Sequence, residues 1–209
     1  MRHLWRFLDC LLLAFVVAVS TVLVAHLVLR PNPNSADAEQ YAVLSAYIEP
    51  NLTGYSHDLG GRDGMVVIAA RSTFSQPMLN SNKLRQYRSL VLSTGHAKTT
   101  IQDLSRSMVF EFWATNLRDV TLERKLHLAH YELATEDEMT QYPSATFFAR
   151  FPNSYGALTF SRIAFNRDLT EAFFYTEHLC GLCGEGKFVY MRKIADKWVV
   201  AGTASTWIS

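Results

Sequence analysis

Residues 156–201 decide the fold, and they read GALTFSRIAFNRDLTEAFFYTEHLCGLCGEGKFVYMRKIADKWVVA. Runs rich in aromatic and β-branched residues alternate with short segments that contain Asn, Asp or Gly, which is the composition of strands joined by turns. The runs predict strands over 156–165, 171–179, 187–194 and from 198 to 201. Consecutive strands joined by short turns pair antiparallel, so we predict a four-stranded meander. Both of its faces carry apolar side chains, so we expect both to be covered at least in part, with helices from earlier in the chain supplying at least one of the covers.

The strand spacing also predicts a row of side chains on one face of the meander. If residue 165 pairs with 171, and 179 with 187, Arg162 and Arg192 lie on either side of Phe174. Such a row is either two long side chains that lie over a ring and reach water, or an anion-binding patch. A register slip of one residue would remove it. Arg162, Phe174, Arg192 and the nearby His178 are therefore our candidate binding residues.

The turn between the second and third strands carries two cysteines, Cys180 and Cys183, each followed by glycine. In an oxidising compartment they form a disulfide candidate. Three other interpretations stay open. The first is two unbridged structural thiols. The second is a metal site that adds His178 to the two cysteines and still lacks a fourth ligand. The third is thiol exchange, although the usual activation at a helix N-terminus is missing between two strands. We assign no catalytic residue, no metal ligand and no cofactor.

The N-terminus predicts export of the rest of the chain. Residues 11–29 are an apolar run long enough to approach the ~30 Å hydrocarbon thickness of a bilayer. Arg2 and Arg6 precede the run and only Arg30 directly follows it, which favours a cytoplasmic tail over 1–10 and an exported body. The alternative is a cleaved signal peptide that leaves a secreted or periplasmic protein. Residues 30–36, with two prolines, are then a linker.

Residues 37–209 are predicted to form one domain. Asp37 and Gln40 can cap a helix that ends at Pro50, and Thr135 opens a capping box. Further elements predicted from hydrophobic periodicity are a buried strand at 65–70, a weak helix at 81–92, a helix from Thr100 to Asn116, a strand at 125–133 and a helix turn or two within 144–151. The fold class is α+β, with a mostly antiparallel sheet covered by helices.

Composition limits the function. Hydrophobic residues make up 49% and charged residues 19% of the chain, which is typical of a globular domain. The formal net charge is only +1. That balance argues against electrostatic capture of nucleic acid.

Three segments of the C-terminal half together resemble a pattern in a family of bacterial envelope proteins. These segments are 160–166 (FSRIAFN), 180–186 (CGLCGEG) and 198–200 (WVV). No activity is attached to that family, so the resemblance implies an envelope setting and no catalytic residues.

Together these observations predict a single-pass, membrane-anchored binding or interaction module outside the cytoplasm. Its partners would be the membrane, through the N-terminal helix, and a protein or small molecule that the sequence does not identify. The alternatives are a thiol–disulfide redox protein or other enzyme centred on Cys180 and Cys183, with Glu177 and His178 adjacent, and a structural zinc domain. Glu177 and His178 should point to opposite faces of their strand.

Overall fold

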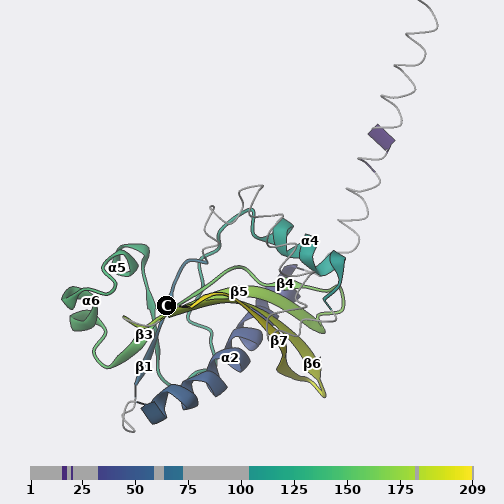
Figure 1. Cartoon of the computed structure of the whole chain (residues 1–209). Coiled ribbons are helices and arrows are strands. Elements are labelled where there is room, and N and C mark those ends of the chain that lie inside the picture. The colour runs from purple at the N-terminus through teal and green to yellow at the C-terminus, as the bar shows by residue number, and fades with distance from the viewer. Residues whose placement is uncertain are drawn as a thin grey trace, which may run out of the picture.

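A computed structural model describes residues 16, 17, 20, 33–58, 64–72, 104–181 and 184–208. The predicted tail, most of the apolar run and the helix predicted at 81–92 lie outside these residues. Among the described residues, no helix is both long and apolar enough to cross a membrane. The body is one twisted sheet with helices on both of its faces (Figure 1).

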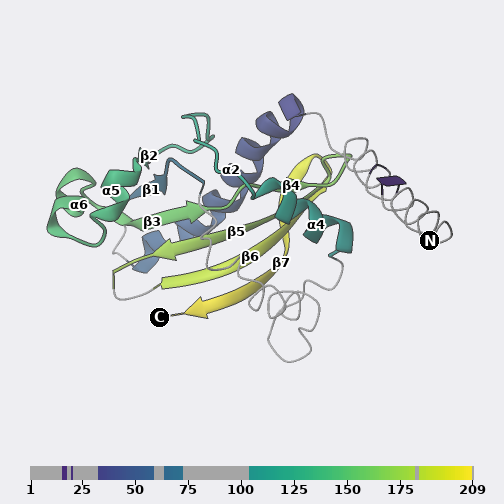
Figure 2. The same ribbon diagram turned by 90° about the horizontal axis from the view of Figure 1, so that it is seen from above.

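The sheet has seven strands, in the order β2-β1-β3-β5-β6-β7, with β4 also paired to β5 (Figure 2). The strands are β1 (Met65–Ala69), β2 (Tyr131–Ala134), β3 (Ser154–Phe160), β4 (Ala164–Phe165), β5 (Glu171–Leu179), β6 (Gly184–Ile194) and β7 (Lys197–Ile208). β1 is parallel to β2 and β3, and all other pairs are antiparallel. The predicted meander is confirmed, and so is its extension by the strand near residue 65.

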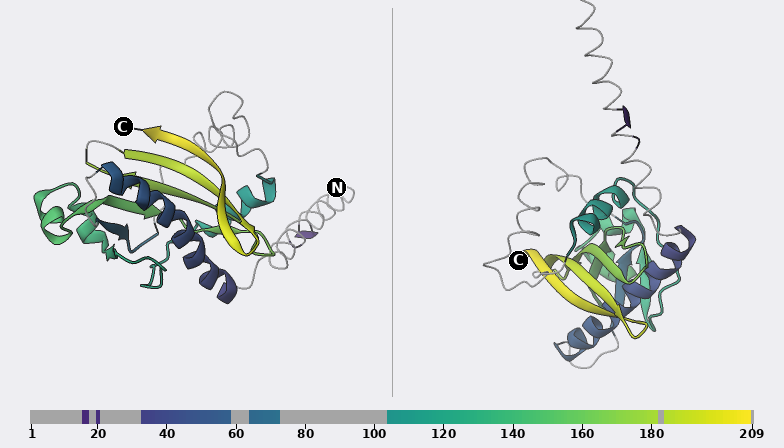
Figure 3. Two further views of the ribbon diagram at one scale, coloured as in Figure 1. Left: turned by 90° about the horizontal axis from the view of Figure 1, so that it is seen from below. Right: turned by 90° about the vertical axis from the view of Figure 1, so that its right-hand side faces the viewer.

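Four helices are described with their full bounds: α2 (Pro33–Asp58), α4 (Arg106–Thr115), α5 (Glu136–Thr140) and α6 (Ala145–Arg150). α2 runs diagonally across one face of the sheet (Figure 3). Its Leu44 and Ile48 are almost fully buried against that face, and each contributes about 1.5–3 kcal/mol by leaving water. Tyr47 packs edge-on against Phe174, with ring centroids 5.3 Å apart.

α4 covers the opposite face, as the sequence predicts. Met108 and Phe112 are buried there against Phe173 and Phe188, whose rings stack 5.4 Å apart. The helix begins at Arg106 and not near residue 100, because the Ser105 hydroxyl accepts the Met108 N–H (3.1 Å) and caps it. Its predicted end at Asn116 is confirmed.

α5 and α6 pack on the β1–β3 side of the sheet, where Phe147 and Phe151 bury themselves against Val67 and Ala157. The predicted capping box is present, with the Thr135 hydroxyl accepting the Glu138 N–H and the Glu138 carboxylate accepting the Thr135 N–H. The predicted helix near 144–151 is confirmed as α6.

The predicted bounds of the first helix are wrong at both ends. α2 begins at Pro33, inside the expected linker, where proline is favoured as the first helical residue because its missing N–H costs nothing. It also continues through Pro50 to Asp58. Asp37 is therefore a residue of the second turn and not a cap.

The strand predicted at 125–133 is also wrong, because only Tyr131–Ala134 is extended. The preceding segment is a loop that lies against α2. In it the Leu126 N–H donates to the Tyr131 hydroxyl (3.2 Å) and the His127 N–H donates to the Ser45 hydroxyl (2.8 Å). Leu126 is buried without belonging to a strand. Side-chain hydroxyls thus replace the ladder partners that a strand would need.

The strand predicted at 156–165 is interrupted. β3 ends at Phe160 and β4 resumes at Ala164, with Ser161 between them bonding β5 twice: its N–H donates to the Tyr175 carbonyl and its hydroxyl accepts the Tyr175 N–H. The predicted register is wrong as well, since Leu179 pairs with Gly184 and not with residue 187.

Candidate binding site

The cysteine turn lies at the end of the sheet that is also near α5 and α6. Cys180 follows the last β5 residue, and Cys183 lies outside the described residues, so their disulfide stays a prediction. The Gly181 N–H donates to the Tyr142 hydroxyl, which ties the turn to the α5–α6 connection. Gly156 of β3 has φ +100°, and a Cβ there would overlap the Leu179 carbonyl. The hairpin end is therefore held closely by its neighbours.

Glu177 and His178 point to opposite faces, as predicted. On the α4 side, the Tyr175 hydroxyl donates to the Glu177 carboxylate (3.0 Å). On the α2 side, His178 is buried, with Nε2 3.0 Å from the Tyr155 carbonyl oxygen. No group of three or more His, Cys, Asp or Glu side chains that could hold a metal ion occurs among the described residues, which do not include Cys183.

A small pocket adjoins His178 beneath α2. Its polar lining includes Glu185 and Lys187, which form an ion pair with each other. Its volume is about 30 Å³, enough for a very few water molecules and about tenfold below the size of ordinary ligand pockets. This pocket is too small to bind a metabolite.

Arg162, Phe174 and Arg192 are not brought together. Phe174 is completely buried under α2. Arg192 lies opposite Glu171 and donates to the Tyr190 hydroxyl (2.9 Å), on the α4 face of the sheet. The predicted row fails because the strand register differs from the predicted one, while Arg162 enters a different site.

That site is a groove of about 440 Å³ between the start of α2, the end of α4 and the β3–β4 junction. This volume is in the range of small-molecule sites. The apolar and small lining residues are Ala36, Ala114, Thr115, Leu117, Ile163 and Phe165, and the charged ones are Asp37, Glu111, Arg118 and Arg162. Figure 2 shows α4 next to β4, which supplies Phe165 to the groove wall.

Asn116 fixes the geometry of the groove. Its side chain accepts the Arg162 N–H (2.8 Å) and donates to the Arg162 carbonyl (3.1 Å) and to the Phe112 carbonyl (2.9 Å). Asn116 is only 7% exposed. The two bonds to Arg162 join the β3–β4 junction to the end of α4, and the bond to Phe112 fixes the Asn116 side chain on the helix.

The four charged residues of the groove differ in their partners. Arg162 donates to the Thr115 carbonyl (3.0 Å) at the negative end of the α4 dipole, and Glu111 accepts from the Thr115 hydroxyl (3.3 Å). By contrast, Arg118 and Asp37 make no side-chain hydrogen bond or salt bridge within the part of the chain that the structure describes, and Asp37 interacts only at longer range with the charge of Lys125. One cation and one anion thus face the same groove without neutralising each other.

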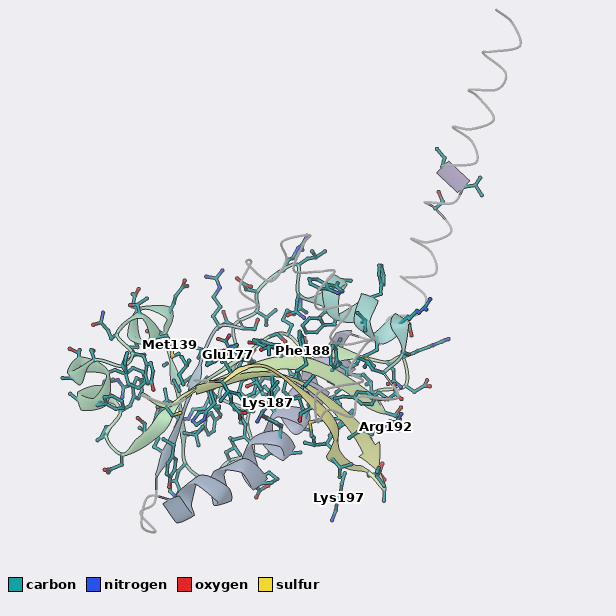
Figure 4. The ribbon with its side chains drawn as sticks, viewed as in Figure 1. Met139, Glu177, Lys187, Phe188, Arg192 and Lys197 are labelled. Atoms are coloured by element: carbon teal, nitrogen blue, oxygen red, sulfur yellow. The ribbon has the colours of Figure 1, made fainter. Side chains whose placement is uncertain are left out.

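A second polar cluster lies on the α4 face, around Tyr175. Its hydroxyl accepts the Trp207 indole N–H (3.0 Å) and lies 3.2 Å from the Thr206 hydroxyl. The Trp207 indole and the Tyr175 hydroxyl lie over Gly186, where an added Cβ would overlap both of them. Burial raises the pKa of Tyr175 well above its usual value, and the charge of Glu177 adds to that rise. The labelled Glu177 and Phe188 mark this region in Figure 4. The cluster is a hydrogen-bonded network that joins β5 to β7.

Of the groove residues, only Arg162 was predicted from the sequence as a candidate binding residue, and for a different reason, while Asp37 was predicted as a helix cap. The walls come from positions near 36, 111–118 and 162–165, so no local spacing reveals them. The available signal is Asn116, an amide at a predicted helix end, which sequence reasoning treated only as a terminator.

No protein-family model matches the chain, and no curated protein or solved structure matches it either. The resemblance in the C-terminal half therefore stays a prediction.

Proposed function

We propose that this protein is a membrane-anchored, extracytoplasmic binding module, and that the groove between α2 and α4 holds a small zwitterionic ligand. The observation that carries the proposal is the pair Arg118 and Asp37, two opposite charges on the walls of one groove that have no hydrogen-bond or salt-bridge partner among the described residues. A ligand with a single charge would satisfy one of them only.

The ligand's anionic group is best a phosphate or a carboxylate. A guanidinium binds either group through paired N–H donors, and Arg118 is exposed enough to reorient toward it. The ligand's ammonium group would lie near Asp37. Ala114 and Ile163 supply the apolar surface between the two charges. The rigid Asn116 clamp favours binding because little ordering entropy is lost.

The anchor in this proposal comes from the apolar run at 11–29 and the arginines before it. We further propose that Cys180 and Cys183 form a disulfide that closes the β5–β6 hairpin. The support is the pairing of Leu179 with Gly184, which makes the two cysteines the first and last residues of the connecting turn. The envelope setting implied by the C-terminal resemblance favours the same bond. Thiols counted on the denatured protein should rise by two after reduction, and an unchanged count would disprove the disulfide.

The ligand proposal is tested with full-length protein in detergent micelles and three soluble probes. Glycerophosphoethanolamine carries both charges, glycerol 3-phosphate only the negative one, and ethanolamine only the positive one. The zwitterion has about 13 non-hydrogen atoms, and at about 0.3 kcal/mol per atom it should bind with a Kd near 1 mM. Ligand-observed NMR measures affinities in this range.

Two variants locate the site. Arg118→Gln and Asp37→Asn should each weaken zwitterion binding by roughly two- to fivefold, the usual value of an exposed charge pair. Arg167→Gln, an exposed arginine on the β4–β5 turn, is the matched control and should bind like the parent. Equal binding of all three probes, or no binding at 20 mM, would refute the proposal.

A further inference from the structure

We infer that the zwitterion is the headgroup of a phospholipid, of the phosphoethanolamine class, in the bilayer that holds the anchor. This inference rests on the proposed function and names the source of its ligand. It requires that the groove lie at the bilayer surface, and three observations place it there.

The first observation is the length of the connection to the apolar run. The run ends at residue 29 and α2 begins at Pro33. At ~3.5 Å per residue, this connection spans at most about 14 Å. Ala36 and Asp37, one turn further along, are groove residues. If the run spans the bilayer, the groove therefore opens within reach of the headgroup layer.

The second observation is the exposed apolar surface at this end of the domain. Leu117, which lines the groove, is 73% exposed, and Ile194, at the β6–β7 turn, is 60% exposed. The β6–β7 hairpin is tied to the start of α2, because Lys193 and the Trp198 indole both bond the Glu39 carboxylate (2.6 Å each). Figure 3 (left) shows this turn beside the beginning of α2. Exposed apolar side chains beside the end of α4 and on the β6–β7 turn therefore lie at the end of the domain where α2 begins, as in proteins that bind to a membrane surface.

The third observation is the charge of the same end. Arg118, Arg167 and Lys197 are exposed there, together with Asp168 and Asp196 on the two turns. Because the charges nearly balance, attraction to anionic lipid is weak. A zwitterionic headgroup suits this surface better than an anionic one.

The test uses the full-length protein in nanodiscs that contain a phosphatidylethanolamine with a photoreactive group on its headgroup. Crosslinks mapped by mass spectrometry should fall on residues 106–118 and around Ile194, besides the anchor itself. The anchor crosslinks serve as an internal reference for reconstitution. A Leu117→Asn, Ile194→Asn double variant should lower the domain crosslinks at least threefold relative to that reference.

Ile208→Asn is the matched control, since Ile208 is 76% exposed but pairs with Glu185 at the opposite end of the sheet. It should leave the crosslinks unchanged. Crosslinks confined to the anchor, together with normal binding of soluble glycerophosphoethanolamine, would overturn the lipid inference and leave the zwitterion site standing. Loss of both would refute the proposed function itself.

Discussion

Replacing Asn116 by alanine should destabilise the protein far more than replacing Asn166, although each side chain makes three hydrogen bonds. Asn166 accepts the N–H groups of Thr170 and Glu171 and donates to the Thr170 hydroxyl. Asn166 is half-buried, on a turn whose residues Arg167 and Asp168 are exposed, so water replaces most of the lost partners. Asn116 is buried, and its loss leaves the Arg162 N–H without an acceptor.

The expected magnitude follows from those bonds. An orphaned buried N–H costs about 1–3 kcal/mol and each further lost bond about 0.5–1.5 kcal/mol. The Phe112 and Arg162 carbonyls keep other donors, namely the Asn116 N–H and the Ser161 hydroxyl. We therefore expect about 3 kcal/mol for Asn116→Ala and below about 1 kcal/mol for Asn166→Ala. At roughly 2–4 °C per kcal/mol, the first variant should lower Tm by about 6–12 °C.

Thermal unfolding in detergent, followed by near-ultraviolet circular dichroism, measures both shifts. Asn116→Asp keeps the acceptor for the Arg162 N–H, but its second carboxylate oxygen would face the Phe112 and Arg162 carbonyl oxygens in a buried site, so its Tm should be at least as low as that of the alanine variant. Equal decreases in Tm for Asn116→Ala and Asn166→Ala would refute the reasoning, because burial of the side chain would then not determine the loss of stability.

Three further predictions follow from single sites. Gly156→Ala should destabilise the protein more than Gly181→Ala. Both glycines have a positive φ, but only at Gly156 would the new Cβ also overlap a backbone group, the Leu179 carbonyl. Chemical denaturation of the two variants measures the difference in the free energy of unfolding. Gly186→Ala should cost about 1–3 kcal/mol, and adding Tyr175→Phe should recover part of it by removing the overlapping hydroxyl, as thermal unfolding of the double variant would show. Stability should fall as pH rises above about 10: the pKa of Tyr175 is raised in the folded state, so the unfolded tyrosine ionises first and draws the equilibrium toward unfolding. Tyr175→Phe should flatten that pH dependence, and an unchanged slope would contradict it.

Local chemistry explains which elements could be predicted. The bounds predicted for β5 are confirmed, because its aromatic run is flanked by Asn166 turn chemistry and by glycines. The Thr135 helix is confirmed, because its cap is built entirely from residues within one turn. The bounds of an element can therefore be predicted where residues close together in the sequence supply its capping and turn hydrogen bonds.

The β5–β6 register could not be predicted, because glycines were taken as turn residues. Gly184 and Gly186 belong to β6. This position in the strand requires glycine, because Trp207 and the Tyr175 hydroxyl occupy the space that a side chain would take. That reason involves residues of two other strands and is invisible to local pattern. The groove could not be predicted for the same reason, since only tertiary packing places Arg118 and Asp37 on the walls of one groove.

The position of β1 has a consequence for the time course of synthesis. β1 lies between β2 and β3, so both of its partners are made after it. At about 5–20 residues per second, Ser154 follows Ala69 by roughly 4–17 s. β2 is made first, and until Ala134 appears, roughly 3–13 s after Ala69, the apolar segment Met65–Ala69 has neither neighbour with which to pair. We therefore expect the nascent chain to need a holding chaperone in this window, and a chain arrested before residue 154 to aggregate more readily than one arrested after residue 194.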